Sequence, residues 1–106
     1  GGLKLGGTAG ATTNNTTISL QAEASPELNY YQNYCIGIYD GDARFNTRVI
    51  SSSTYANPTV ATVSRAFTDK GYTDVPKSGS LYKIGVVNPG FEINDITIIY
   101  RAKAIK

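Results

Sequence analysis

The longest strand signal in the chain is its last stretch, Phe91-Glu-Ile-Asn-Asp-Ile-Thr-Ile-Ile-Tyr-Arg-Ala-Lys-Ala-Ile-Lys106. From Ile96 onward, Ile, Tyr and Ala at even positions alternate with mostly polar residues at odd positions. A period of two places these two sets on opposite faces of a β-strand. The alternation slips at Asn94-Asp95, and a bulge there would return the earlier apolar residues to the same face. We therefore predict a long closing strand in two segments, around which the other strands pack.

Shorter strand signals fill the rest of the chain. Alternating or β-branched residues predict strands over residues 16–22, 34–39, 44–51, 59–63 and 81–84. Turn signals separate them, among them Asp40-Gly41, Asn57-Pro58 and the run 69–71. Ser25-Pro26-Glu27 has the composition of a helix start, which predicts one or two helical turns over residues 24–31. Short strands between closely spaced turns predict an all-β fold, a single-domain antiparallel β-sandwich or barrel of jelly-roll-like type.

The chain of 106 residues has the length of one domain. Residues 1–15 are rich in Gly and Thr and have little to bury, so we expect a flexible N-terminal arm there. Residues 16–106 form the predicted β-domain. The chain lacks the run of about eighteen apolar residues that a membrane-spanning helix requires.

Composition argues against most kinds of chemistry. Ten Lys and Arg against eight Asp and Glu give a net charge of +2, too small to indicate nucleic acid or a membrane surface as a partner. The chain has no His, so a catalytic Cys35 would lack its usual base, and its apolar neighbours predict a small buried hydrophobic residue instead. We expect no enzyme activity, no cofactor and no metal.

Carboxylates are the remaining reactive groups. Asp40 with Asp42, or Glu92 with Asp95, could form the pair that a glycosidase needs, but a chain of this size rarely forms the cleft. Asp40-Gly41-Asp42 could also ligate calcium, although the following Ala, Arg and Phe supply no further ligands. A hairpin turn with solvated acids is the favoured interpretation.

Tyrosine is the abundant aromatic residue, with eight copies and no Trp. Tyrosine is common at protein interfaces, and its ring can also stack on a sugar. The basic end of the chain could meet an acidic neighbour, or could serve as a solvated strand edge. The candidate interface residues are Tyr30, Tyr31, Tyr55, Tyr72, Arg101 and Lys103.

The order of features between residues 30 and 84 is distinctive. It consists of Tyr30-Tyr31-Gln-Asn, Ile36-Gly-Ile-Tyr-Asp-Gly41, Arg48-Val-Ile50, Ala61-Thr-Val63, Ala66-Phe67, Pro76 and Ser80-Leu-Tyr-Lys-Ile84. This order resembles a domain that recurs in virion proteins of tailed bacteriophages, in which Trp is common at the position of Phe67. Residues 92–101 also look like the closing strand of jelly-roll-type phage structural domains.

The resemblance implies a non-enzymatic structural protein of the virion, either a capsid decoration protein or a tail fibre or baseplate component. Its implied partners are other virion proteins, copies of itself and, as a further candidate, host-surface glycans. The N-terminal arm would become ordered on a neighbouring subunit. A carbohydrate-binding β-sandwich module, suggested by the tyrosines expected in loops, is the alternative.

Overall fold

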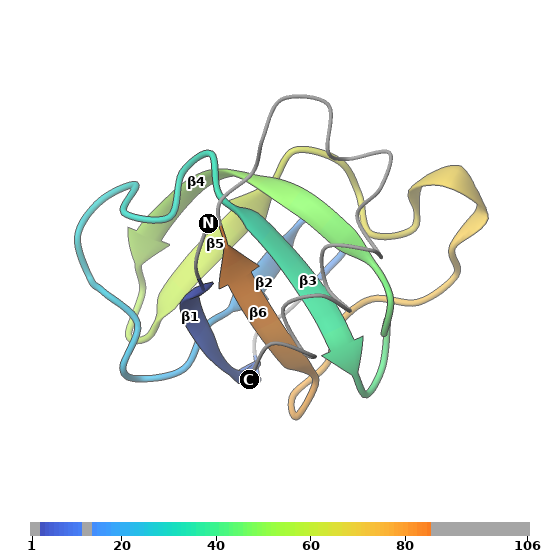
Figure 1. The fold of residues 1–106 in the computed structure, drawn as a ribbon, viewed down its shortest axis with the longest axis horizontal. Coiled ribbons are helices and arrows are strands. Elements are labelled where there is room, and N and C mark those ends of the chain that lie inside the picture. Colours follow the sequence, from blue (N-terminus) through green and yellow to red (C-terminus); the bar gives the residue numbers. More distant parts are fainter. Residues whose placement is uncertain (1–2, 12–13, 86–106) are drawn as a thin grey trace.

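The computed structural model describes residues 3–11 and 14–85 of the chain. Six strands and one 3₁₀ turn make up its regular structure: β1 (Leu3–Thr8), β2 (Thr17–Ser19), β3 (Cys35–Asp40), β4 (Thr47–Tyr55), β5 (Thr59–Val63), η1 (Asp69–Gly71) and β6 (Leu81–Gly85). They form one antiparallel sheet in the order β1-β6-β3-β4-β5-β2, which confirms the predicted all-β fold (Figure 1). The predicted closing strand over residues 91–106 lies outside the described residues. Among the described residues there is no helix long and apolar enough to cross a membrane.

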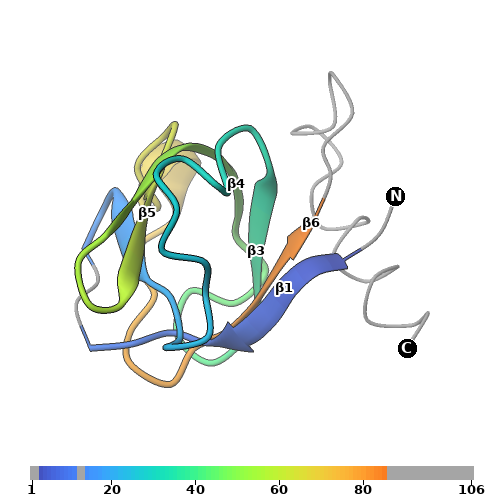
Figure 2. The same cartoon turned by 90° about the vertical axis from the view of Figure 1, so that its left-hand side faces the viewer.

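The long strand β4 curls the sheet into a half-barrel. Its first residues, 47–49, pair with β3, and its later residues, 50–55, pair with β5. The register shifts between Ile50 and Ser52, which marks a bulge at the point where the strand changes partner. Figure 2 shows the result, with β3 and β6 on one side, β5 on the other and β4 between them.

The hydrophobic core fills the inside of this curl. Side chains from both halves of the sheet form one buried cluster, because alternate residues of each strand face inward. Its large side chains that are 0% exposed are Ile18, Leu20, Ile36, Ile38, Ile50, Phe67, Tyr82 and Ile84. Cys35 is buried as well, which confirms its interpretation as a small buried hydrophobic residue.

Two local features of the structure were not predicted from the sequence. Residues 24–31 form successive turns instead of a helix, since Asn29 adopts a positive φ of 57° that a right-handed helix does not allow. The first residues of the expected arm form strand β1, paired with β6 from Leu3 to Thr8. Leu5 packs against the core from this strand, but the glycines around it left only a weak strand signal in the sequence.

The gap between the outer strands β1 and β2 is closed partly by one side chain. The Gln21 amide donates to the Gly6 carbonyl over 3.0 Å and accepts the Thr8 N–H over 3.4 Å, taking the place of a neighbouring strand. Gly7 lies between these contacts, and a Cβ at this position would clash with the side-chain oxygen of Gln21. The Gln21 N–H donates to the Tyr82 hydroxyl over 3.0 Å, and burial raises the pKa of Tyr82 to about 12. The outward Gly6 carbonyl and Thr8 N–H of β1 are therefore already bonded to Gln21. They do not remain open for pairing with a strand of another chain.

Candidate functional site

Two loops at the two ends of β3 carry exposed apolar side chains. The tyrosine loop (residues 24–34) precedes β3, and the β3–β4 loop (residues 41–46) follows it; they lie on the left and at the lower right of Figure 1. Leu28 in the tyrosine loop is 69% exposed, and Phe45 in the β3–β4 loop is 37% exposed. Burying a large apolar side chain away from water is favourable, so each loop offers a surface for a contact.

The tyrosine loop is tied to β4 by neutral hydrogen bonds. The Asn29 N–H donates to the Ser53 carbonyl over 2.7 Å, and the Asn29 side-chain oxygen accepts the Ser53 N–H over 3.1 Å. Asn33 and Tyr34 exchange backbone bonds with Ile50, each of 2.8 Å. The loop therefore continues along the part of β4 that β3 no longer covers, which fixes the position of the exposed Leu28.

Tyr30 and Tyr31 have opposite environments although they are adjacent. Tyr31 is 2% exposed, and its hydroxyl accepts the Ser25 N–H over 2.8 Å inside the core. Tyr31, one of the candidate interface residues, is therefore buried, because the backbone turn directs its side chain inward. Tyr30 is 38% exposed and meets the Tyr31 ring edge-on, with 5.0 Å between the ring centres. Only Tyr30 of this pair has surface to offer to a partner.

Lys4 of β1 covers part of the tyrosine loop. Its ammonium lies 4.4 Å from the centre of the Tyr30 ring and 4.9 Å from that of Tyr34. Hydrogen bonding to Tyr34 above all, together with Tyr30, raises the pKa of Lys4. The strand that was expected to be a flexible arm thus contributes a cation to this surface.

The β3–β4 loop is held in a backbone conformation that its residues disfavour. Ala43 and Phe45 have positive φ values of 66° and 74°, in the left-handed region where side chains other than glycine are strained. The Phe45 N–H donates to the Ile38 carbonyl over 2.6 Å, and the buried Asn46 amide donates to the Ala43 carbonyl over 2.9 Å. These bonds hold Phe45 in place at the surface despite its backbone strain.

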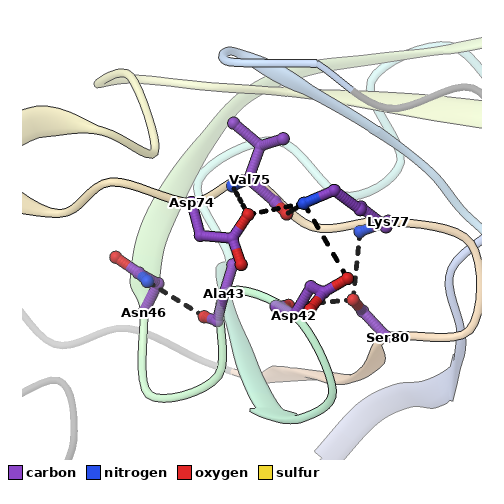
Figure 3. Close-up of polar contacts among 7 residues, drawn as sticks. All are labelled: Asp42, Ala43, Asn46, Asp74, Val75, Lys77 and Ser80. Carbon is purple, nitrogen blue, oxygen red and sulfur yellow. Dashed lines mark hydrogen bonds and ion pairs between the residues drawn. The ribbon is translucent and has the colours of Figure 1, made fainter.

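A polar clamp, formed by Asp42, Asp74, Lys77 and Ser80, joins the β3–β4 loop to the loop before β6 (Figure 3). The Ser80 hydroxyl donates to the Asp42 carbonyl over 2.9 Å and accepts the Lys77 N–H over 3.0 Å. The Lys77 ammonium lies 2.5 Å from an Asp74 oxygen and 3.8 Å from an Asp42 oxygen. The clamp therefore fixes the base of the loop that presents Phe45.

The charges of the clamp support one another. Hydrogen bonding from Lys77, with smaller contributions from the backbone of Val75 and Ala43, lowers the pKa of Asp74. The same bond to Asp74, with a weaker effect of Asp42, raises the pKa of Lys77. Asp74 and Lys77 are therefore both charged at neutral pH.

The suggested calcium loop is part of this clamp. The Asp40 carboxylate accepts the Gly41 N–H over 2.9 Å. The Asp42 carboxylate faces the Lys77 ammonium and not a second carboxylate with which it could share a cation. Within residues 3–11 and 14–85, no group of three or more His, Cys, Asp and Glu side chains could hold a metal ion. Glu92 and Asp95, the other carboxylate pair, lie outside the described residues.

The remaining interface candidates are spread over the molecule. Tyr55, 56% exposed, ends β4 beside the tyrosine loop, and its hydroxyl donates to Asn57 Oδ1 over 3.0 Å. Tyr72 follows η1, beyond the opposite end of β5, and its ring centre lies 5.8 Å from the Arg48 guanidinium carbon. Tyr55 and Tyr72 therefore cannot stack on one sugar ring. Arg101 and Lys103 lie outside the described residues.

Sequence reasoning missed Leu28 and Phe45, the exposed apolar residues of the two loops. A signal was present for each, since Leu28 stands between turn-forming residues and Phe45 follows the Asp-Gly turn by only a few positions. Comparisons of the chain with models of protein families, with curated proteins and with solved structures gave no significant match.

Proposed function

We propose that this chain is a non-enzymatic structural module that acts through protein–protein contacts. The carrying observation is Phe45, a partly exposed aromatic residue in a strained backbone conformation within a loop whose base the polar clamp holds. Exposing the ring and straining the backbone both cost free energy, and such costs are typical of functional positions. A contact that covers the ring would recover part of this cost.

The tyrosine loop supports the same proposal. Its neutral bonds to β4 fix the loop before any partner arrives, so little conformational entropy is lost when a partner binds. Leu28, Tyr30 and Tyr55 are exposed at this end of the molecule. Tyrosine in particular contributes a large contact area with few rotatable bonds.

The assembly we propose is a bacteriophage virion, in which this chain would be a capsid decoration protein or a tail fibre or baseplate component. This part of the proposal rests on the resemblance of residues 30–84 to virion domains. Many copies in a particle can hold together through individually weak contacts, because linked sites act together.

Electron microscopy of particles from the source of the chain, with a gold-labelled antibody against it, tests the proposal. We expect label at regular positions on a particle. A chain that is found only outside particles, and that binds no particle protein when these are separated and probed, would overturn it. A matched sample with an antibody against denatured chain controls for adsorbed protein.

Carbohydrate binding is the second candidate, and one observation favours it. The Tyr55 ring is exposed and its orientation is fixed by the bond to Asn57, as a stacking platform requires. A glycan array with Tyr55→Ala and Tyr72→Ala variants tests it: binding that only Tyr55→Ala abolishes supports a one-ring platform. Absence of binding at about millimolar sugar, an affinity of about 4 kcal/mol, would exclude this candidate.

A further inference from the structure

We propose that the outer face of β3, β4 and β6 is the docking surface for residues 91–106, the end of this same chain. The inference goes beyond the proposed function and does not depend on it. The outer face consists of residues that point away from the core: Cys35 and Gly37 of β3, Thr47 and Val49 of β4, and Lys83 of β6. The closing segment would form a second layer over these three strands.

The strand registers place these residues on one face. Gly37 lies opposite Thr47 in one neighbouring strand and opposite Lys83 in the other, and Cys35 lies opposite Val49. Residues opposite one another in neighbouring strands share a face, as do alternate residues of one strand. The residues next to them along β3 and β6 belong to the hydrophobic core inside the curl: Ile36, Ile38, Tyr82 and Ile84. The outer-face residues therefore point in the opposite direction.

The outer face is buried although it points away from the core. Thr47 is 2% exposed, Lys83 3% and Cys35 4%, and Gly37 is buried as well. A sheet that packs on one side only exposes its other face to water, whereas burial of both faces requires a layer on each side. Figure 2 shows the other described strands in line with β3 and β6 or on their inner side, and none of them over the outer face. A segment outside the described residues is therefore needed to cover it.

The length and the starting point of the remaining chain identify this segment. Residues 1–2 and 12–13 are too short to cover three strands, which leaves residues 86–106. They follow directly from Gly85, which ends β6 beside the outer face. Asn88-Pro89-Gly90 is a turn signal that can direct the chain back over this face. Consecutive elements usually lie next to one another, so the closing segment can reach the face by a short connection.

The closing segment and the outer face match in shape and polarity. Ile96 and Ile98 lie on one side of the predicted closing strand and can bury apolar surface against Cys35 and Val49. Gly37 has no side chain, and a glycine inside a strand lets another backbone approach closely. The middle of the face can therefore accept a strand at short distance.

Lys83 adds a polar requirement to the occupant. Its ammonium is buried and lies 5.1 Å from the centre of the Tyr39 ring. A buried ammonium is costly unless a carboxylate or another acceptor lies close to it. Asp95 is on the same side of the predicted closing strand as Phe91 and Ile93, so it can bring a carboxylate toward this face. An occupant with apolar residues and a carboxylate therefore fits better than a purely apolar one.

Methyl NOE spectroscopy of the full chain, labelled at Ile and Val, tests the inference directly. We expect NOEs between the Val49 methyls and the δ1 methyl of Ile96 or Ile98. Ile99 lies on the opposite side of the predicted strand and is the internal control, for which no NOE to Val49 is expected. Absence of the expected NOEs, or NOEs to Ile99 alone, would overturn the inference. NOEs that arise only between differently labelled copies in a mixed sample would overturn it too, because the occupant would then be a second copy.

Alkylation of Cys35 by iodoacetamide, followed by mass spectrometry, measures how well the outer face is covered. The thiol of the wild-type chain should react slowly. Ile98→Asp should raise the rate about tenfold, because a carboxylate against this face favours local opening, and the matched change Thr97→Asp on the opposite side should leave the rate unchanged. The milder Ile98→Ala should give a smaller increase, and it replaces Ile98→Asp if circular dichroism shows that variant to be unfolded. If neither Ile98 variant reacts faster than Thr97→Asp, the closing segment does not cover Cys35 and the inference fails.

Discussion

The two loops that flank β3 are held by different means. Hydrogen bonds of the backbone and of Asn29 tie the tyrosine loop to β4, and the buried Tyr31 anchors it in the core. The β3–β4 loop is held by the polar clamp, whose charged side chains are about half exposed. Buried neutral groups contribute to global stability, whereas exposed ion pairs contribute little. The difference indicates that damage to the first loop affects the whole fold, and damage to the second stays local.

Truncation of Tyr31 should have the largest effect. Tyr31→Ala removes a buried aromatic ring and should lower the free energy of unfolding by about 3–5 kcal/mol. Tyr31→Phe keeps the ring and removes only the acceptor for the Ser25 N–H, so it should cost about 1–3 kcal/mol. Urea denaturation of both variants measures the two values. Equal losses in the two variants would show that the hydroxyl, and not the ring, anchors the loop.

Ser53→Ala should come next in size. The buried Ser53 hydroxyl accepts the Tyr31 N–H over 3.2 Å, and its loss leaves this N–H without its acceptor, which costs about 1–3 kcal/mol. Ser52→Ala, a change at the neighbouring and less buried position, is the control and should cost less than Ser53→Ala. If the two variants unfold at the same urea concentration, the side-chain bond contributes little and the backbone bonds alone hold the loop.

The local patterns of the sequence predicted the centre of the sheet well. The predicted strand 59–63 coincides with β5, and 34–39 differs from β3 by one residue at each end, because clear apolar or β-branched runs end at turn residues there. β1 was missed because a Gly-rich segment becomes a strand only when β6 and Gln21 are in place to pair with it. Its formation depends on tertiary contacts that local propensity does not encode.

Sequence patterns predicted the two loops of the candidate site less well than the strands of the sheet. Ser25 does accept the Glu27 N–H over 3.2 Å, as a helix start would have it, but the bonds of Asn29 to Ser53 divert the chain before a helix can form. The same turn separates the buried Tyr31 from the exposed Tyr30, and adjacent identical residues carry no local signal of that difference. The clamp joins residues more than thirty positions apart, which no short motif reveals.

At Phe45, a change to glycine should destabilise the chain less than a change to alanine, because glycine relieves the backbone strain in the β3–β4 loop. Phe45 has a φ of 74°, which glycine adopts without strain, so Phe45→Gly should be more stable than Phe45→Ala by about 1 kcal/mol. Both variants lose the ring, so the comparison isolates the backbone term. Thermal unfolding followed by circular dichroism measures it. Equal stability of the two variants would mean that the loop rearranges and that no strain is stored there.

A change of pH should release the β3–β4 loop and leave the tyrosine loop in place. The pKa of Asp74 is lowered in the folded chain, so the stabilisation from its charge is present at neutral pH and is lost as the pH falls through this lowered value, below about 4. The pKa of Lys77 is raised, so its contribution persists through neutral pH and is lost as the pH rises through that raised value, above about 10.5. The amide resonances of Ala43 and Phe45 should therefore shift at low pH while that of Tyr31, held by neutral groups, should not. Asp74→Asn should abolish the acid shift at Ala43; a shift that persists in this variant would show that the charge of Asp74 does not hold this loop.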